Sequence, residues 1–274
     1  MIRLKPTERR CIRLQEYQQL EIMSFKAWPA LNETERGGCF FRLSEGYTKR
    51  ANSANPVLHD MKNPGLLIDS CISVYRNAGL TPVFKIIDTE KYTKLDARLE
   101  ALGWSKIDPT AVMTAELEPA GQAAAAEEDV NIIVEDRITS GWIENYYRVS
   151  GIKPEHKDIA GKMLREIDAP VIAVSVSLSA ADGRTAEPAG IAACGYGHIS
   201  GDAVGLFDIT VAPAYRNKGL GRLLVRSIMN KAADAGCSRA YLQVVEENAP
   251  AVNLYRSEGF SEVYGYWYRI EAGK

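Results

Sequence analysis

The chain has 274 residues, of which 46% are apolar and 25% are charged, and its formal net charge is −2. This length is typical of two globular domains, and the composition is ordinary for such domains. A nearly neutral net charge disfavours a nucleic-acid substrate without excluding one, and no apolar run reaches the roughly 20 residues of a membrane-spanning helix. We therefore expect no nucleic-acid partner and no membrane partner.

The cysteines and the N-terminus bear on the compartment. The chain has 5 cysteines, an odd number without the paired spacing of a zinc site. Charged residues surround Cys11 where a signal peptide would have its apolar core. Both features favour reduced thiols, a cytoplasmic protein and no bound metal. The sequence does not indicate an oligomeric state.

The first half alternates helical and strand patterns. Helical patterns cover residues 12–26, 66–77 and 92–102, and strand-like runs cover 38–43, 82–87 and 111–117. Residues 48–56 are polar and predict a connection. Residues 119–128 are rich in alanine, a low-complexity composition that predicts a linker between domain 1–118 and domain 129–274.

The second half predicts a mixed sheet with flanking helices. Strands are expected at 130–134, 171–178, 190–196, 206–211, 239–245 and 260–270. Helices are expected at 139–149 and 154–167, between Leu220 and Gly236, and after Asn248. Turn-rich pieces at 182–183 and 200–202 predict an antiparallel meander within this half.

Residues 211–222 join a strand to a helix through a loop with two glycines. Pro213 cannot continue a sheet ladder, and Gly219 and Gly221 lack a Cβ, so a ligand can approach the first helical turn. Unpaired amides and the positive end of the helix dipole favour a phosphate there. The residues expected to supply these amides are Arg216, Asn217, Lys218, Gly219, Leu220, Gly221 and Arg222. A tight turn without a ligand is the alternative interpretation.

Two further blocks give this loop a family resemblance. Arg216-x-x-Gly219-x-Gly221 is followed by the strand at 239–245 and then by Asn248-x-x-Ala251-x-x-Leu254-Tyr255-x-x-x-Gly259-Phe260. In residue types and spacing, this pattern resembles the GCN5-related N-acetyltransferases (GNAT), and the resemblance covers residues 129–270. It implies an α+β fold, with a mixed, mostly antiparallel sheet flanked by helices and a splayed strand pair beside a pyrophosphate loop.

The resemblance also implies an activity and its site residues. It implies an acyltransferase that moves an acetyl group from acetyl-CoA to a primary amine of a small molecule or peptide, by direct attack in a ternary complex. The pantetheine arm would pair with the strand edge at Ile209, Thr210 and Val211. Asn248 would lie near the same arm, or would only cap the following helix. Tyr255 would protonate the departing thiolate, with packing in the core as the alternative.

The sequence does not identify the general base. Some members of the resembled family carry a glutamate early on the strand before the loop, where this chain has Gly205. Asp208 is the nearest carboxylate on that strand, and strand alternation would point it away from Phe207 and Ile209. A solvated strand carboxylate is the alternative, and we expect His198 to be a surface or hydrogen-bonded residue.

The first half carries a degenerate copy of the pattern. The segments 79–103 and 236–259 share the order glycine, strand, helix, glycine. The first copy has Leu99 in the tyrosine position and residues 59–66 in place of the glycine loop. We therefore expect the first half to bind no CoA and to shape the cleft of the second.

Aromatic residues gather on a helix that borders the acceptor cleft in the resembled fold, and on the last strand. They are Trp142, Tyr146 and Tyr147, with the carboxylate of Glu144, and Tyr264, Tyr266, Trp267 and Tyr268. An aromatic cleft would suit a small cationic or aromatic amine, and core packing is the alternative. A protein that binds or senses acyl-CoA without turnover is the alternative function, but it would not need Tyr255.

Overall fold

The computed structural model describes residues 14–118, 130–168, 170–178 and 190–272. The chain divides into two compact units. Unit 1 comprises residues 1–113, 243–249 and 262–274, and unit 2 comprises residues 114–242 and 250–261. The linker predicted at 119–128 and the turn predicted at 182–183 lie outside the described residues.

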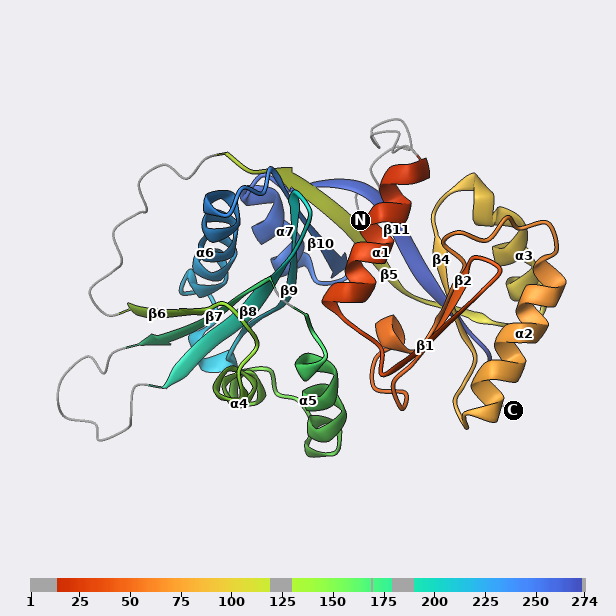
Figure 1. Ribbon diagram of the computed structural model, residues 1–274, viewed down its shortest axis with the longest axis horizontal. Helices are drawn as coiled ribbons and strands as arrows, with labels where there is room; N and C mark the ends of the chain where they lie inside the picture. The colour runs from red at the N-terminus through yellow and green to blue at the C-terminus, as the bar shows by residue number, and fades with distance from the viewer. Residues whose placement is uncertain (1–13, 119–129, 169, 179–189, 273–274) are drawn as a thin grey trace. The chain divides into compact units, whose positions relative to one another are not determined.

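Unit 1 is a sheet with helices on both faces. Its elements are α1 (Leu14–Ala27), β1 (Asn32–Arg36), β2 (Cys39–Leu43), β3 (Ala54–Asn55), α2 (Pro64–Asn77), β4 (Val83–Ile87), α3 (Thr93–Ala101), most of β5 (Ser105–Glu116) and the final strand β11 (Ser261–Ile270). The strand order is β1-β2-β3-β4-β11-β5. Lys85 of β4 bonds to Glu21 of α1, whereas the adjacent Phe84 contacts Trp104 after α3. Since neighbouring strand residues face opposite sides, α1 and α3 cover opposite faces (Figure 1).

Unit 2 is built around an antiparallel meander. Its elements are β6 (Val130–Glu135), α4 (Ser140–Val149), α5 (Lys157–Arg165), β7 (Val171–Leu178), β8 (Ile191–Ser200), β9 (Ala203–Val211), α6 (Leu220–Asp234), and most of β10 (Arg239–Val245) and α7 (Ala249–Ser257). The strand order is β10-β9-β8-β7-β6, with β9 and β10 parallel and the other pairs antiparallel. The predicted mixed, mostly antiparallel sheet is confirmed.

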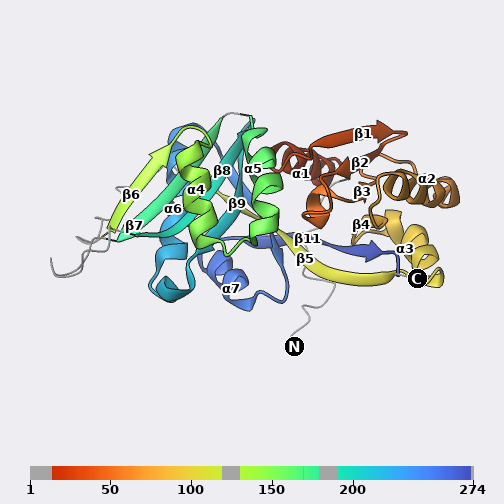
Figure 2. The same cartoon turned by 90° about the horizontal axis from the view of Figure 1, so that it is seen from below.

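Helices cover both faces of the unit 2 sheet. On β8, a Cβ added to Gly197 would overlap Ile228 of α6, whereas the ring of the adjacent Tyr196 meets that of Trp142 of α4. The two helices therefore lie on opposite faces. Figure 2 shows α4 and α5 together on one face. Within the described residues, no helix is both long and apolar enough to cross a membrane.

The two predicted copies close their helices in the same way. In each copy a left-handed glycine follows both helices, and the next N–H donates back to a carbonyl in the helix. The glycines are Gly79 and Gly103 in the first copy and Gly236 and Gly259 in the second. The bonds run from Leu80, Trp104, Cys237 and Phe260 to Tyr75, Leu99, Ala232 and Tyr255, at 2.9 or 3.0 Å. This repetition is what a duplication predicts.

The compact units differ from the predicted domains at the ends of the two halves. β11 belongs to unit 1 because it pairs antiparallel with β4, from Tyr266↔Ile87 to Ile270↔Val83. The end of the first half belongs to unit 2, where the Leu117 N–H donates to the Ser238 carbonyl at 2.8 Å. Each half thus contributes chain to the other unit, and the domain ranges 1–118 and 129–274 stay a prediction.

Candidate active site

The strand before the glycine loop has a bulge at Asp208. The pairing of β8 with β9 passes from Tyr196↔Phe207 to Cys194↔Thr210, so β9 carries one extra residue. Asp208 has φ +50°, which is uncommon for a residue with a Cβ. The alternation expected for Asp208 is therefore wrong, because the bulge interrupts the two-residue period of the strand.

Gly195 of β8 makes room for this bulge. A Cβ added to Gly195 would lie 2.6 Å from Ile209 Cδ1 and 3.2 Å from Ile209 Cα. Asp208 is half-buried, and its Oδ2 atom is inaccessible to solvent. Burial and, to a lesser extent, the Asp208 carboxylate raise the pKa of the Cys194 thiol. The carboxylate therefore lies toward the interior, on the side of β8.

The strand before the glycine loop, β9, pairs with β10 in parallel. Parallel pairs run from Arg239↔Ala203 to Leu242↔Leu206, although β9 continues to Val211. The half-buried residues Ile209, Thr210 and Val211 follow the last of these pairs. The strand edge predicted to meet the pantetheine arm is therefore the last part of β9, directly before the glycine loop.

The loop leads into α6 without a side-chain cap. After a 3₁₀ turn at Pro213–Tyr215, Asn217 and Gly219 have φ +61° and +79°. Gly219 is the N-cap of α6, and because it has no side chain, the N-cap residue cannot bond to the helix amides through one. A Cβ added to Gly219 would meet nothing within 4 Å, so this side of the loop is open. No side chain of the N-cap residue therefore occupies the amides of the first turn of α6, as a phosphate site requires.

Three segments meet at Gly221. A Cβ added to Gly221 would lie 3.2 Å from Leu254 Cδ2 of α7 and 3.8 Å from Val211 Cγ2 of β9. Tyr255 follows Leu254, is 8% exposed, and meets the ring of Phe260 at a centroid distance of 5.9 Å. The structure thus brings the end of β9, the glycine loop and the tyrosine helix together. Gly221 permits this packing, a role that no local pattern in the sequence predicts, because Leu254 lies far along the chain.

The comparison with known families agrees with this arrangement. A family model described as "Probable histone acetyltransferase Rv0428c C-terminal" matches residues 15–269. The chain belongs to this family of GCN5-related N-acetyltransferases. Membership makes it an acyltransferase of the GNAT class.

Individual relatives span the whole chain or short parts of it. The chain is 28% identical to the "Uncharacterized N-acetyltransferase YobR" of Bacillus subtilis, over 94% of this chain and 100% of that protein. It is 36% identical to the thialysine N-epsilon-acetyltransferase of Sus scrofa, over 27% of this chain and 47% of that protein. It is 39% identical to the [ribosomal protein bS18]-alanine N-acetyltransferase of Escherichia coli, over 22% of this chain and 41% of that protein.

Solved structures show the same fold over nearly the full length. A GCN5-related N-acetyltransferase from Kribbella flavida superposes with a TM-score of 0.66 at 11% identity, covering 94% of this chain and 96% of that one. A tandem GNAT protein from the clavulanic acid biosynthesis pathway superposes with a TM-score of 0.63 at 10% identity, covering 93% and 89%. The GNAT fold predicted from the sequence is confirmed.

Asn248 directly precedes α7. It is exposed, and its N–H donates to the Val245 carbonyl at 3.0 Å. It falls in unit 1, whereas the glycine loop and Tyr255 fall in unit 2. Its position at the start of a helix suits a cap, and its contact with CoA stays a prediction.

A tyrosine lies beside Gly205, where some GNAT enzymes carry a glutamate. A Cβ added to Gly205 would lie 2.5 Å from the Tyr241 hydroxyl and 2.6 Å from Phe207 Cε2. Tyr241 and His198 are the cross-strand partners of Gly205 on its two sides. His198 is 4% exposed and so is not at the surface. No carboxylate can therefore be placed at Gly205, and Asp208 stays the candidate on this strand.

Most of the aromatic residues expected near an acceptor belong to the cores. Trp142, Tyr146, Tyr264, Tyr266 and Tyr268 are each at most 7% exposed. Two others hold neighbouring elements: the Tyr147 hydroxyl donates to the Lys157 carbonyl at 2.5 Å, and Trp267 Nε1 donates to Asp96 at 2.9 Å. For these rings the packing interpretation holds.

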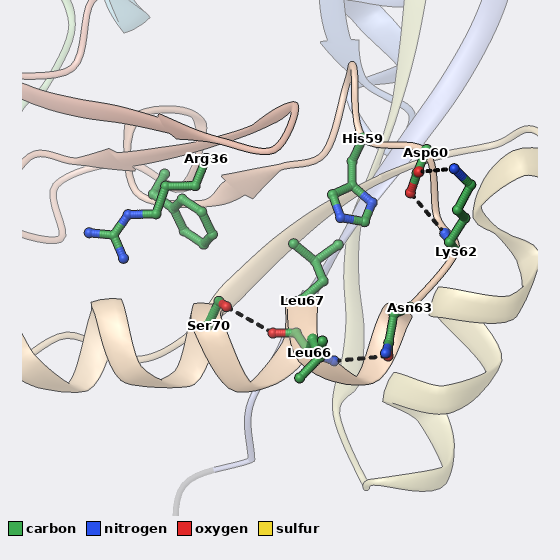
Figure 3. A pocket seen from close by; sticks show the side chains of 9 residues that line it. Arg36, His59, Asp60, Lys62, Asn63, Leu66, Leu67 and Ser70 are labelled. Atoms are coloured by element: carbon green, nitrogen blue, oxygen red, sulfur yellow. Dashed lines mark hydrogen bonds and ion pairs between the residues drawn. The ribbon is translucent and has the colours of Figure 1, made fainter.

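In the first half, α2 takes the place of α6, and a side chain of the first half caps its first turn. At the start of α2, Asn63 Oδ1 accepts the Leu66 N–H at 3.3 Å, and Pro64 has no N–H to offer (Figure 3). The pocket beside it, about 200 Å³, is lined by residues that include Arg36, His59 and Lys62. The first turn of α2 is capped where that of α6 is not.

Proposed function

We propose that this GNAT protein transfers an acetyl group from acetyl-CoA to a primary amine of a small molecule or peptide, by direct attack in a ternary complex. The observation that carries the proposal is the meeting at Gly221, which joins uncapped helix amides to the Tyr255 helix. The relatives named for thialysine and for the alanine of a ribosomal protein support an amine acceptor. We also infer that the protein is cytoplasmic and needs no metal.

Each predicted residue has a defined task. The amides from Arg216 to Arg222 would bind the pyrophosphate of CoA, and Ile209 to Val211 would orient the pantetheine arm. As the amine nitrogen bonds to the acetyl carbon and the carbon–sulfur bond breaks, Tyr255 would give its proton to the sulfur. Asp208 or water would take the proton that the amine loses.

The Arg216 and Arg222 side chains have partners within unit 2. Arg216 Nε donates to the Val211 carbonyl at 3.3 Å, and Arg222 Nε donates to Glu258 at 2.8 Å. The contacts proposed for these residues with the pyrophosphate would therefore come from their backbone amides.

The test is a thiol-release assay with acetyl-CoA and a panel of amines: lysine, thialysine, spermidine, an arylamine and a peptide with an N-terminal alanine. We expect release of free CoA thiol that depends on one of these amines and is lost in Gly219→Asp. Tight binding of acetyl-CoA without amine-dependent release for any acceptor class would instead favour a protein that binds or senses acyl-CoA.

A further inference from the structure

Glu258 at the end of α7 joins two arginines of α6. Arg222 Nε lies 2.8 Å from Glu258 Oε1, and Arg226 bonds to both carboxylate oxygens, at 2.6 and 3.2 Å. The Glu258 side chain is 6% exposed, whereas those of Arg222 and Arg226 are 49% and 57% exposed. We call these three residues the Glu258 clamp. Its two-pronged geometry and buried carboxylate distinguish it from an ordinary surface ion pair.

At one end, the clamp is attached to Tyr255 through the backbone. The Glu258 N–H donates to the carbonyls of Leu254 and Tyr255, both at 3.1 Å. The Phe260 N–H donates to the same Tyr255 carbonyl at 3.0 Å, and the two rings meet edge to face. Glu258 therefore belongs to the closed turn that holds Tyr255, and a shift of Glu258 moves that turn.

At the other end, the clamp is attached to the first turn of α6. Arg222 follows Gly221, the residue that packs against Leu254. Arg222 Nη2 also donates to Ser257 Oγ at 3.3 Å, and that hydroxyl donates to the Leu254 carbonyl at 2.7 Å. The start of α6 and the end of α7 are thus joined on both sides of Tyr255.

The Glu258 carboxylate holds the two positive charges of the clamp close together. Arg222 and Arg226 are four residues apart on one face of a helix, an arrangement in which like charges repel. Arg222 also places a positive charge near the positive end of the α6 dipole, which is unfavourable. The C-terminal end of α7, which is the negative end of its dipole, instead favours a positive charge. Without the carboxylate, these arginines would move apart, and the link between the two helices would loosen.

We propose that Glu258 is a positioning residue that fixes Tyr255 relative to the amides of α6. It would then set the rate of acetyl transfer and leave CoA affinity unchanged. The inference rests on the proposed function, in which Tyr255 protonates the thiolate.

The first experiment removes the charge and keeps the shape of the side chain. With acetyl-CoA and the fastest amine of the panel as substrates, we expect Glu258→Gln to lower kcat about tenfold. The Kd of CoA should stay within about twofold of wild type. Arg226→Gln should lower kcat in the same direction. The matched control is Asp202→Asn, which breaks the ion pair of Arg239 with Asp202 elsewhere in unit 2 and should leave kcat unchanged. Unchanged kcat in Glu258→Gln, or tighter CoA binding alone, would overturn the proposal.

The second experiment asks whether Glu258 acts through Tyr255. In a Tyr255→Phe background, Glu258→Gln should cause no further loss of kcat, because the group that it positions is already gone. A tenfold loss in both backgrounds would overturn the positioning role. Should Tyr255→Phe alone retain full kcat, the general-acid role would fail, and with it the route by which Glu258 is proposed to act.

The third readout needs no turnover, so it separates this inference from the acetyltransferase proposal. Hydrogen exchange at the backbone amides of positions 258, 259 and 260 should be at least tenfold faster in Glu258→Gln than in wild type or in Asp202→Asn. Unchanged exchange at these amides would overturn the clamp even if no amine substrate is found.

Discussion

Tyr255 is almost completely buried, yet the role proposed for it requires its proton to leave the protein. Proton donation from a phenol with a pKa near 10 to a thiolate, whose conjugate acid has a pKa near 8.5, is unfavourable unless proton transfer accompanies bond breaking or the site lowers the phenol pKa. A fixed ring favours such a concerted transfer. The edge-to-face contact with Phe260 and the closed turn after α7 provide that fixation.

Replacing Tyr255 by phenylalanine separates catalysis from packing. We expect Tyr255→Phe to lower kcat about 100-fold, with little change in CoA affinity or melting temperature, because only the hydroxyl is removed. The loss should shrink with an acyl donor whose thiol is more acidic. Tyr196→Phe, at a core tyrosine stacked on Phe207, is the matched control for hydroxyl deletion. Full turnover in Tyr255→Phe, with chemistry limiting the rate, would remove the general-acid role.

The sequence predicts which residues form the candidate site, but it does not predict their contacts. A short motif predicts Gly219 and Tyr255 as site residues, because it fixes both their types and their spacing. The bulge at Asp208 depends on Gly195 of another strand, and the blocked position at Gly205 depends on Tyr241. Such contacts join distant parts of the chain and leave no local pattern in the sequence.

At the scale of elements, two helix starts in one chain differ in their capping. The first turn of α6 begins at a glycine without a side chain, whereas that of α2 begins at Asn63, which bonds to its own helix. A capping side chain occupies the amide that a phosphate would use. Capping thus predicts which copy binds CoA.

The glycine at the start of α6 can be tested against one at the end of the same helix. Gly219 and Gly236 have φ +79° and +92°, and a Cβ at either would meet nothing within 4 Å. Aspartate should therefore strain both positions similarly, by about 1 kcal/mol. We expect Gly219→Asp to weaken CoA binding at least 100-fold and Gly236→Asp to leave it near wild type, as measured by calorimetry. Equal affinities would rule out phosphate binding at this loop.

The capping of α2 predicts the stoichiometry. Titration of the full chain with CoA should give one site, because the Leu66 amide is already bonded to Asn63 and Pro64 has none to offer. Gly219→Asp should abolish that single site. A stoichiometry of two, or a residual site in the variant, would show that the first half binds CoA as well.

The elements themselves were mostly predictable where apolar periodicity is strong. The strand at Val171–Leu178 and the start of α6 at Leu220 are where the pattern placed them. β1 was missed because every residue of Asn32–Arg36 is exposed, so no alternation appears. β9 begins earlier than predicted, since its first residues are small and include Gly205.

At the scale of the whole molecule, each half contributes chain to the unit formed mainly by the other, and this makes the two halves dependent on each other. The second half ends in β11, which pairs with β4, while the end of the first half bonds to Ser238. Sequence patterns place strands in order but do not reveal which partner a strand takes. The low-complexity segment at 119–128 therefore predicts a domain boundary that the compact units do not follow.

A chain comprising residues 129–274 should not fold as a stable domain. It would lack β4, the partner of β11, and Leu117, the partner of Ser238. We expect no cooperative thermal transition for this fragment, and a transition restored when residues 1–118 are co-expressed with it. A fragment that melts cooperatively and binds CoA alone would show that the second half is self-sufficient.

The pairing of β4 with β11, which begins at Ile87 and Tyr266, also determines when the sheet of unit 1 can be completed during synthesis. A chain is synthesised from its N-terminus, and β4 leaves the ribosome long before β11 exists. Until then, the side of β4 that β11 will cover carries unpaired N–H and C=O groups, which invite association with other chains. Unit 1 therefore stays incomplete until β11 has been made, and until then the nascent chain is open to association with other chains at β4.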